Sequence, residues 1–269
     1  MGNIIFDKYG RVIWLEQEDF WAPTATLGGS RLVFAHAVAH NRIPKTIDPQ
    51  SAYLQTDLAS EEPYYIELPP EVVEALDDED RKMFQKLKKP VCKLVKALYG
   101  LRRSGYDFIT AFTKHLERCG WQRIEGETAL FYRNFGEGSS KRVALICTYV
   151  DDVCLSAPKR DEKRIWREIE AVLEFDPPSD LVKFLGTRTY FPKYRCRKDG
   201  VQESGMHLDQ SDYARLVIET YEKNSGFVVR KRVAPVSDTP FQEEKYERKD
   251  GGTRVRSTVC ALLYLSRGC

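Results

Sequence analysis

The feature that most constrains this chain is a strand-forming run interrupted by two adjacent acids, in the stretch RVALICTYVDDVCLS at residues 142–156. Two apolar runs joined by two turn-forming residues predict a β-hairpin, here with Asp151 and Asp152 as the turn pair. Glycine usually relaxes so tight a turn, because it tolerates positive φ. An Asp-Asp pair instead holds two carboxylates at the hairpin tip, where each raises the pKa of the other unless a cation neutralises them.

A divalent metal ion is the cation that this pair would suit, since hard oxygen ligands favour magnesium. Taken alone, however, an Asp-Asp pair is more often a solvated acidic turn, and a motif match is only a hypothesis. The remainder of the chain has to decide between a metal site and an ordinary turn.

Composition limits the classes of protein open to this chain. Its 269 residues suffice for one large or two smaller domains, and 42% are hydrophobic. No apolar run approaches the roughly 20 residues of a membrane span, and the first ten residues do not resemble a secretion signal, so we expect no membrane partner. The formal charge of +2 is too small to indicate a particular kind of binding partner. Seven cysteines without a Cys-x-x-Cys pair predict a reduced, intracellular protein without a zinc ribbon.

Hydrophobic periodicity predicts helices on both sides of the hairpin. We expect helices over 31–41 with Ser30 as the cap, over 107–119 with Gly120 as the stop, over 161–175 and over 212–223, and a strand-like segment over 181–191. His36 and His40 lie four apart on the first helix, but no third ligand is in view, so we expect no metal there. His115 lies on an apolar stripe and is expected to be a satisfied core residue.

Two further segments carry charge. Residues 45–58, KTIDPQSAYLQTDL, predict a strand followed by a turn, with Asp48 between them. Residues 81–103 contain nine basic side chains and no acid. Such a run is usually a solvated face, yet the alternation of apolar and basic residues, with Tyr99 and Gly100, slightly favours contact with phosphates.

Three carboxylates on two neighbouring strands are what two-metal phosphoryl transfer requires. Two magnesium ions about 3.5–4 Å apart activate the attacking oxygen and stabilise the leaving one. If both strands share one sheet, Asp48, Asp151 and Asp152 supply these ligands.

An ordered set of motifs covers nearly the whole chain. The motifs are Asp48 with 52–54, the stretch 93–102, the tetrapeptide 149–152, Phe-Leu-Gly at 184–186, Leu208 with Gln210 and Tyr213, Thr239-Pro240, and Leu-Leu-Tyr-Leu-Ser at 262–266. In this order they resemble the reverse transcriptase of copia-type retrotransposons with long terminal repeats, whose catalytic hairpin is Tyr-Val-Asp-Asp. The tetrapeptide alone is moderately specific, whereas the ordered set is highly specific.

The resemblance implies an α+β fold of the right-handed polymerase type, with fingers, a ferredoxin-like palm and a partial thumb. It places fingers and palm in residues 1–190, and the thumb with the start of a connection segment in 191–269. It implies an RNA-directed DNA polymerase with two Mg²⁺ ions, or Mn²⁺ instead. The implied partners are an RNA template, a DNA or RNA primer and deoxynucleoside triphosphates, within a polyprotein that carries integrase and ribonuclease H. The implied location is a cytoplasmic virus-like particle or the nucleus.

The resemblance also assigns roles to residues. The metal ligands would be Asp48, Asp151, the more weakly bound Asp152 beside the primer end, and the carbonyl of Pro49. The residues near the incoming nucleotide would be Tyr53 under its sugar, Gly100, Arg102 and Tyr149. The residues on template or primer would be Lys93, Lys96, Arg103 and the primer grip Phe184, Leu185 and Gly186.

Departures from the family pattern keep two alternatives open. Pro49 replaces the usual Val, which predicts a break in the strand, Arg103 replaces the usual Gln, and only Lys8 and Arg11 stand where a basic segment normally grips the triphosphate. We expect a fragment of a longer protein, or a decaying genomic copy. The first alternative is therefore a catalytically weak relic that folds and binds nucleic acid. The second, a nucleotidyl transferase without a template, fits the acids but not the long basic segment.

Overall fold

The computed structural model describes residues 22–59, 63–88, 90–195, 202–230 and 252–268. The chain forms two compact units, Met1–Asp180 and Leu181–Cys269. Within the described residues, no helix has the length and apolar character needed to cross a membrane.

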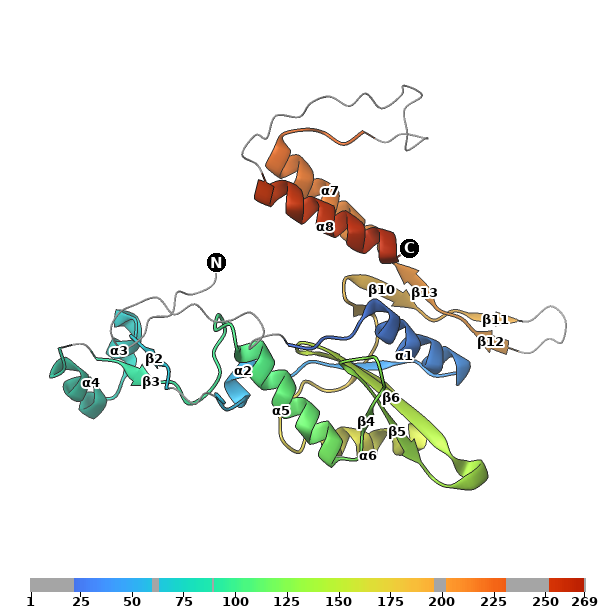
Figure 1. Ribbon diagram of the computed structural model, residues 1–269, viewed down its shortest axis with the longest axis horizontal. Helices are drawn as coiled ribbons and strands as arrows, with labels where there is room; N and C mark the ends of the chain where they lie inside the picture. The colour runs from blue at the N-terminus through green and yellow to red at the C-terminus, as the bar shows by residue number, and fades with distance from the viewer. Residues whose placement is uncertain (1–21, 60–62, 89, 196–201, 231–251, 269) are drawn as a thin grey trace. The chain divides into compact units, whose positions relative to one another are not determined.

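The first unit is built on a six-stranded antiparallel sheet (Figure 1). Its strands, in spatial order, are β4 (Gln122–Arg123), β5 (Leu130–Phe135), β6 (Arg142–Tyr149), β7 (Asp152–Ser156), β1 (Lys45–Ile47) and β8 (Ser179–Asp180). Three helices accompany the sheet: α1 (Leu27–Ala39), α5 (Ser104–Arg118) and α6 (Lys159–Ile169). The run β1, α5, β6, β7, α6, β8 is a β-α-β-β-α-β motif, to which β4 and β5 add an edge beyond β6.

The core lies between one face of this sheet and helices α5 and α6. It contains Ile47 and Val153 from the sheet, Phe112 and Leu116 from α5, and Ile165, Trp166 and Ile169 from α6, among other buried residues. Side chains alternate across a strand, so Val153 and Leu155 face this core while Ser156 faces away. Helix α1 covers the opposite face, where His36 Nδ1 lies 2.9 Å from Ser156 Oγ.

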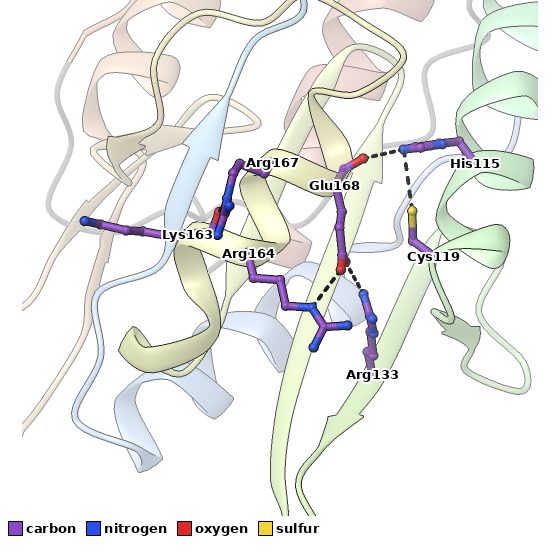
Figure 2. A network of polar contacts seen from close by, with 7 residues as sticks. All are labelled: His115, Cys119, Arg133, Lys163, Arg164, Arg167 and Glu168. Carbon is purple, nitrogen blue, oxygen red and sulfur yellow. Dashed lines mark hydrogen bonds and ion pairs between the residues drawn. The ribbon is translucent and has the colours of Figure 1, made fainter.

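Side-chain hydrogen bonds tie α6 to α5 and β5 (Figure 2). Glu168 forms ion pairs with Arg133 of β5 and, at 2.8 Å, with Arg164. His115 Nε2 donates to the backbone carbonyl of Glu168 at 2.6 Å. The expectation that His115 is a satisfied core residue is therefore confirmed.

The predicted helices are present, but several of their ends differ. Helix α1 begins at Leu27 because Thr26, not Ser30, is the cap, and its hydroxyl accepts from the Gly29 N–H at 2.9 Å. Helix α5 is followed by Gly120 at φ 84°, as expected. The prediction for α6 was wrong at its end: the helix stops at Ile169, before the prolines, because residues 174–176 pair with the chain after β1.

Shorter elements complete the first unit. They are α2 (Ala52–Gln55), β2 (Tyr65–Ile66), α3 (Pro70–Ala75), α4 (Asp78–Gln85), β3 (Cys92–Lys93) and a 3-10 turn η2 (Gly138–Ser140). Strands β2 and β3 pair antiparallel, so the basic segment 81–103 begins on a helix and crosses a small ribbon before α5.

The described residues of the second unit form two small sheets and two helices. The elements are β9 (Lys183–Phe184), β10 (Thr187–Tyr190), β11 (Lys193–Arg195), β12 (Gln202–Ser204), β13 (His207–Asp209), α7 (Ser211–Ser225) and α8 (Gly252–Gly268). The single strand expected over 181–191 is instead a hairpin of β9 and β10, turned by Leu185 and Gly186 at positive φ. The Tyr264 hydroxyl donates to the Leu185 carbonyl, and the rings of Tyr213 and Tyr264 pack with centroids 5.1 Å apart. Thr239-Pro240 lies outside the described residues.

Candidate active site

Three acids lie near one end of the sheet, where β1 and β6 end and β7 begins. In the β6–β7 hairpin Tyr149 pairs with Asp152, and in the β1–β7 pair Ile47 pairs with Val153. One residue beyond the pair of Ile47 and Val153, Asp48 lies beside Asp152. The strands that carry the three acids therefore share one sheet, as the predicted metal site requires.

The predicted turn pair was wrong by one residue. The turn residues are Val150 and Asp151, and Asp152 is already the first residue of β7. Val150 has φ 57°, a conformation that costs a β-branched residue of order 1–3 kcal/mol. This geometry separates the two acids into different roles, because Asp151 lies at the tip while Asp152 lies in the ladder.

After β1 the chain stops pairing with β7 and pairs instead with residues 174–176. The Asp176 N–H donates to the Asp48 carbonyl at 2.9 Å, and the Gln50 N–H donates to the Glu174 carbonyl at 2.9 Å. Between them, Pro49 forms an antiparallel bridge with Phe175. Proline has no N–H for a ladder, so the predicted strand break at Pro49 is confirmed.

The acids influence one another electrostatically. Partial burial raises the pKa of Asp48, and the nearby carboxylates of Asp151 and Asp176 raise it further. The pKa of Asp152 is raised by partial burial and then by Asp151 and Asp48. Both Asp48 and Asp152 remain accessible to solvent as whole residues. The end of the sheet is therefore a place where negative charge is concentrated and only partly hydrated.

The donor set fits a hard divalent cation. Carboxylate oxygens that raise one another's pKa lose this repulsion when a cation lies between them. Within the described residues, no group of three or more His, Cys, Asp or Glu side chains is already gathered closely enough to hold a metal. The acids are thus neighbours whose rotamers have to converge on an ion.

Tyr53 lies at the edge of this acidic cluster. Its ring packs 4.7 Å from the ring of Tyr99 and edge-on to Phe108 at 6.2 Å, measured between centroids. Burial raises the pKa of Tyr53, and Asp151 and Tyr99 raise it further. A Cβ placed on Gly105 would lie 3.7 Å from the Tyr53 hydroxyl, so α5 also approaches this ring closely.

The other predicted nucleotide contacts are accessible. Tyr149 is 38% exposed at the end of β6, and Arg102 is exposed. Gly100 has φ 96°, a conformation that favours glycine. Tyr149 pairs with Asp152, but exposure alone does not join Gly100 and Arg102 to the acids. The role of all three residues at the nucleotide stays a prediction.

The predicted nucleic-acid contacts differ among themselves. Lys93 is exposed, and Lys96 is exposed but forms an ion pair with Asp57 at 2.7 Å. Arg103 departs from the expectation: its side chain is 13% exposed and forms a two-point ion pair with the buried Asp107 at 2.8 and 2.9 Å. That pair, with a bond to the Ala59 carbonyl, directs the guanidinium into the protein. Phe184, Leu185 and Gly186 belong to the second unit.

The sequence did not reveal the side chains that join the segment after Asp48 to residues 174–176. Gln50 Nε2 donates to Asp176 Oδ1 at 2.9 Å, and Gln55 contacts Glu174 through its carboxamide. These polar side chains belong to no recognised motif. Only the pairing of 48–50 with 174–176 reveals them.

Comparison with protein-family models matches residues 4–230 to the family described as reverse transcriptase (RNA-dependent DNA polymerase). This chain belongs to the reverse transcriptase family. The resemblance to copia-type retrotransposon enzymes is thereby confirmed, together with the mixed α and β character of the domain.

Curated relatives place this reverse transcriptase chain among transposon proteins. It is 27% identical over 265 residues to the retrovirus-related Pol polyprotein from transposon RE1 of Arabidopsis thaliana, and 26% identical over 268 residues to that from transposon RE2. Each match covers 98% of this chain but 16% of the relative. A transposon Ty5-1 protein of Saccharomyces cerevisiae is 26% identical over 141 residues, which are 52% of this chain and 41% of that protein. No solved structure matches significantly.

Proposed function

We propose that this chain is the catalytic core of an RNA-directed DNA polymerase. It would extend a DNA or RNA primer on an RNA template, using deoxynucleoside triphosphates. The observation that carries this proposal is the meeting of Asp48, Asp151 and Asp152 at one sheet end, where the pKa values of Asp48 and Asp152 are raised by neighbouring acids. The family membership supports the same chemistry.

Divalent metal ions serve reverse transcriptases generally, and here two Mg²⁺ ions, or Mn²⁺, would activate the primer hydroxyl and stabilise the leaving pyrophosphate. Asp48 and Asp151 would hold these ions with help from the Pro49 carbonyl. Asp152, fixed in the β7 ladder, would lie beside the primer end and bind metal more weakly. Because these acids are already partly shielded from water, binding the ions would displace little solvent.

The remaining residues would orient the substrates. Tyr53 would pack under the sugar of the incoming nucleotide, with Gly100, Arg102 and Tyr149 near it. Lys93 and Lys96 would contact template or primer phosphates, and Phe184, Leu185 and Gly186 would form the primer grip. The internal ion pair with Asp107 supports a structural role for Arg103 instead, at the start of α5.

The polymerase parts follow from this assignment. The β-α-β-β-α-β run would be the ferredoxin-like palm, with fingers from the preceding segments and 56–103, and a partial thumb from about residue 191. The two compact units divide somewhat earlier, after Asp180. The chain would act within a longer polyprotein with integrase and ribonuclease H, in a cytoplasmic virus-like particle or the nucleus.

A catalytically weak relic is the second candidate function. The observation that favours it is that Arg103, one of the predicted nucleic-acid contacts, is instead engaged in an ion pair with the buried Asp107. Such a relic would still bind nucleic acid through the basic segment.

Primer extension on an RNA template with Mg²⁺ separates the candidates. Incorporation that follows the template sequence supports the polymerase. Incorporation that ignores the template identifies a nucleotidyl transferase. Salt-sensitive binding without incorporation, in a folded protein, identifies the relic and overturns the polymerase proposal.

A further inference from the structure

The segment Glu174–Asp176 runs beside Asp48–Gln50, and one side chain from α2 extends this pairing. Two backbone hydrogen bonds flank the bridge between Pro49 and Phe175. Gln55, the last residue of α2, then places its carboxamide on Glu174. The Glu174 N–H donates to Gln55 Oε1 at 2.6 Å, and Gln55 Nε2 donates to the Glu174 carbonyl at 3.0 Å.

This carboxamide acts as a peptide group would. A primary amide offers one acceptor and two donors, so it can satisfy both backbone groups of a residue at the end of a ladder. Gln55 Nε2 also donates to the Gln50 carbonyl. One side chain therefore contacts both segments of the pair.

Gln55 is also joined to the predicted nucleotide site. Tyr53 lies two residues earlier on the same four-residue helix. That helix has no side-chain cap, and it follows Ser51 at a positive φ of 48°. A helix this short gains little stability by itself, so tertiary contacts must fix its position.

We propose that Gln55 is a positioning residue, whose carboxamide holds the segment after Asp48 and the helix that carries Tyr53 in one arrangement. The positions of Asp48 and of the Tyr53 ring are thereby coupled. This inference rests on the proposed function for the roles of Asp48 and Tyr53, but the anchoring itself does not depend on catalysis.

Two variants separate hydrogen bonding from packing. Gln55→Leu keeps most of the side-chain volume and loses both the donors and the acceptor. Gln55→Ala removes the whole side chain. The matched control is Gln122→Ala in β4, at the opposite edge of the sheet, where an exposed carboxamide accepts a hydrogen bond from Tyr132.

The first readout is amide hydrogen exchange in the metal-free protein. Both Gln55 variants should speed exchange at Glu174 by about fivefold, the scale set by one net hydrogen bond. Exchange in β6 and β7 should stay unchanged, as should the whole pattern in Gln122→Ala. Wild-type exchange at Glu174 in Gln55→Leu overturns the proposal, because packing alone would then suffice.

The second readout measures coupling between the sites. Binding of Mn²⁺, followed by its paramagnetic resonance signal, should weaken in both variants, and the KM for deoxynucleotides should rise more than kcat falls. Faster exchange with unchanged Mn²⁺ binding and KM also overturns the positioning role. A wild-type protein without extension activity or Mn²⁺ binding contradicts the proposed function instead, and leaves the exchange test of the anchor intact.

Discussion

Asp48 and Asp152 occupy neighbouring positions across strands β1 and β7, because the register that pairs Ile47 with Val153 reaches the two acids one residue later. Each belongs to a segment held by backbone hydrogen bonds, so the backbone positions of the two acids are fixed relative to each other. Their proximity raises the pKa of Asp152, in addition to the effects of burial and Asp151. Two ionised carboxylates this close repel each other without a cation and are stabilised when a cation binds between them.

Tyr53 should discriminate against ribonucleotides. A ring under the sugar leaves room for deoxyribose, whereas a 2′-hydroxyl would collide with the ring edge. Tyr53→Val should therefore admit ribonucleotides far better, with only a modest fall in deoxynucleotide use. The measurement is the ratio of ribonucleotide to deoxynucleotide incorporation.

Tyr53→Phe is the control for this prediction, since it keeps the ring that packs on Tyr99. It should retain discrimination. If Tyr53 were only a core residue, Tyr53→Val would cost roughly 2–4 kcal/mol of stability and leave the ratio untouched. An unchanged ratio in a folded, active variant rules out the gate.

The basic segment 81–103 should bind nucleic acid through phosphates. Each phosphate that a basic side chain neutralises releases condensed counterions, so affinity should fall steeply with salt. The triple variant Lys93→Ala, Lys96→Ala, Arg102→Ala should flatten the slope of log Kd against log salt, by roughly 0.7–0.9 for each phosphate that is no longer neutralised.

The control triple variant changes three exposed basic residues of α5 and α6, Lys114, Lys159 and Arg160, to Ala. It removes the same formal charge from helices outside the segment. Equal slopes for both triple variants would assign the segment to a solvated face.

His36 should make the fold sensitive to acid. Burial lowers the pKa of His36 from 6.5 to about 4, and the nearby His40 and Arg42 contribute to this shift. A folded-state pKa below the unfolded value means that the unfolded chain binds the proton more readily. Stability from this group is therefore complete above about pH 6.5 and is lost as the pH falls toward about 4.

Thermal unfolding of wild type and His36→Leu between pH 7 and pH 4.5 measures this effect. The wild type should lose more stability than the variant over this interval, while the exposed His207→Gln should behave as wild type. Parallel pH profiles for wild type and His36→Leu would show that the imidazole is not desolvated as described.

The sequence predicted the placement of the three acids better than it predicted their surroundings. Asp48, Asp151 and Asp152 follow strand-forming runs, and strand pairing leaves few ways to arrange them. The turn was misplaced by one residue because Val150 is an unfavourable turn residue, which the structure nevertheless holds at positive φ. Local preference was overridden by the pairing of Tyr149 with Asp152.

Tertiary partners explain the other differences. Arg103 was expected on nucleic acid because a basic run does not show which side chain has a buried acid four residues later. Gln55 and Asp176 lie far from each other in sequence and contain no motif, so nothing local indicates that both lie behind Asp48. The end of α6 was missed because the residues that follow it, 174–176, pair with a segment more than a hundred residues earlier.

The most direct test is Mg²⁺-dependent primer extension on an RNA template by wild type, Asp48→Asn and Asp151→Asn. Each substitution removes a full negative charge from the proposed metal site, where electrostatic stabilisation of the transferring phosphoryl group dominates catalysis. Asp48→Asn and Asp151→Asn should both lose extension, and Asp152→Asn should lose less than Asp151→Asn. All three should melt without metal at the wild-type temperature or higher, because repulsion between the acids is relieved. Near wild-type extension by both Asp48→Asn and Asp151→Asn would contradict the assignment of these acids to the metal site.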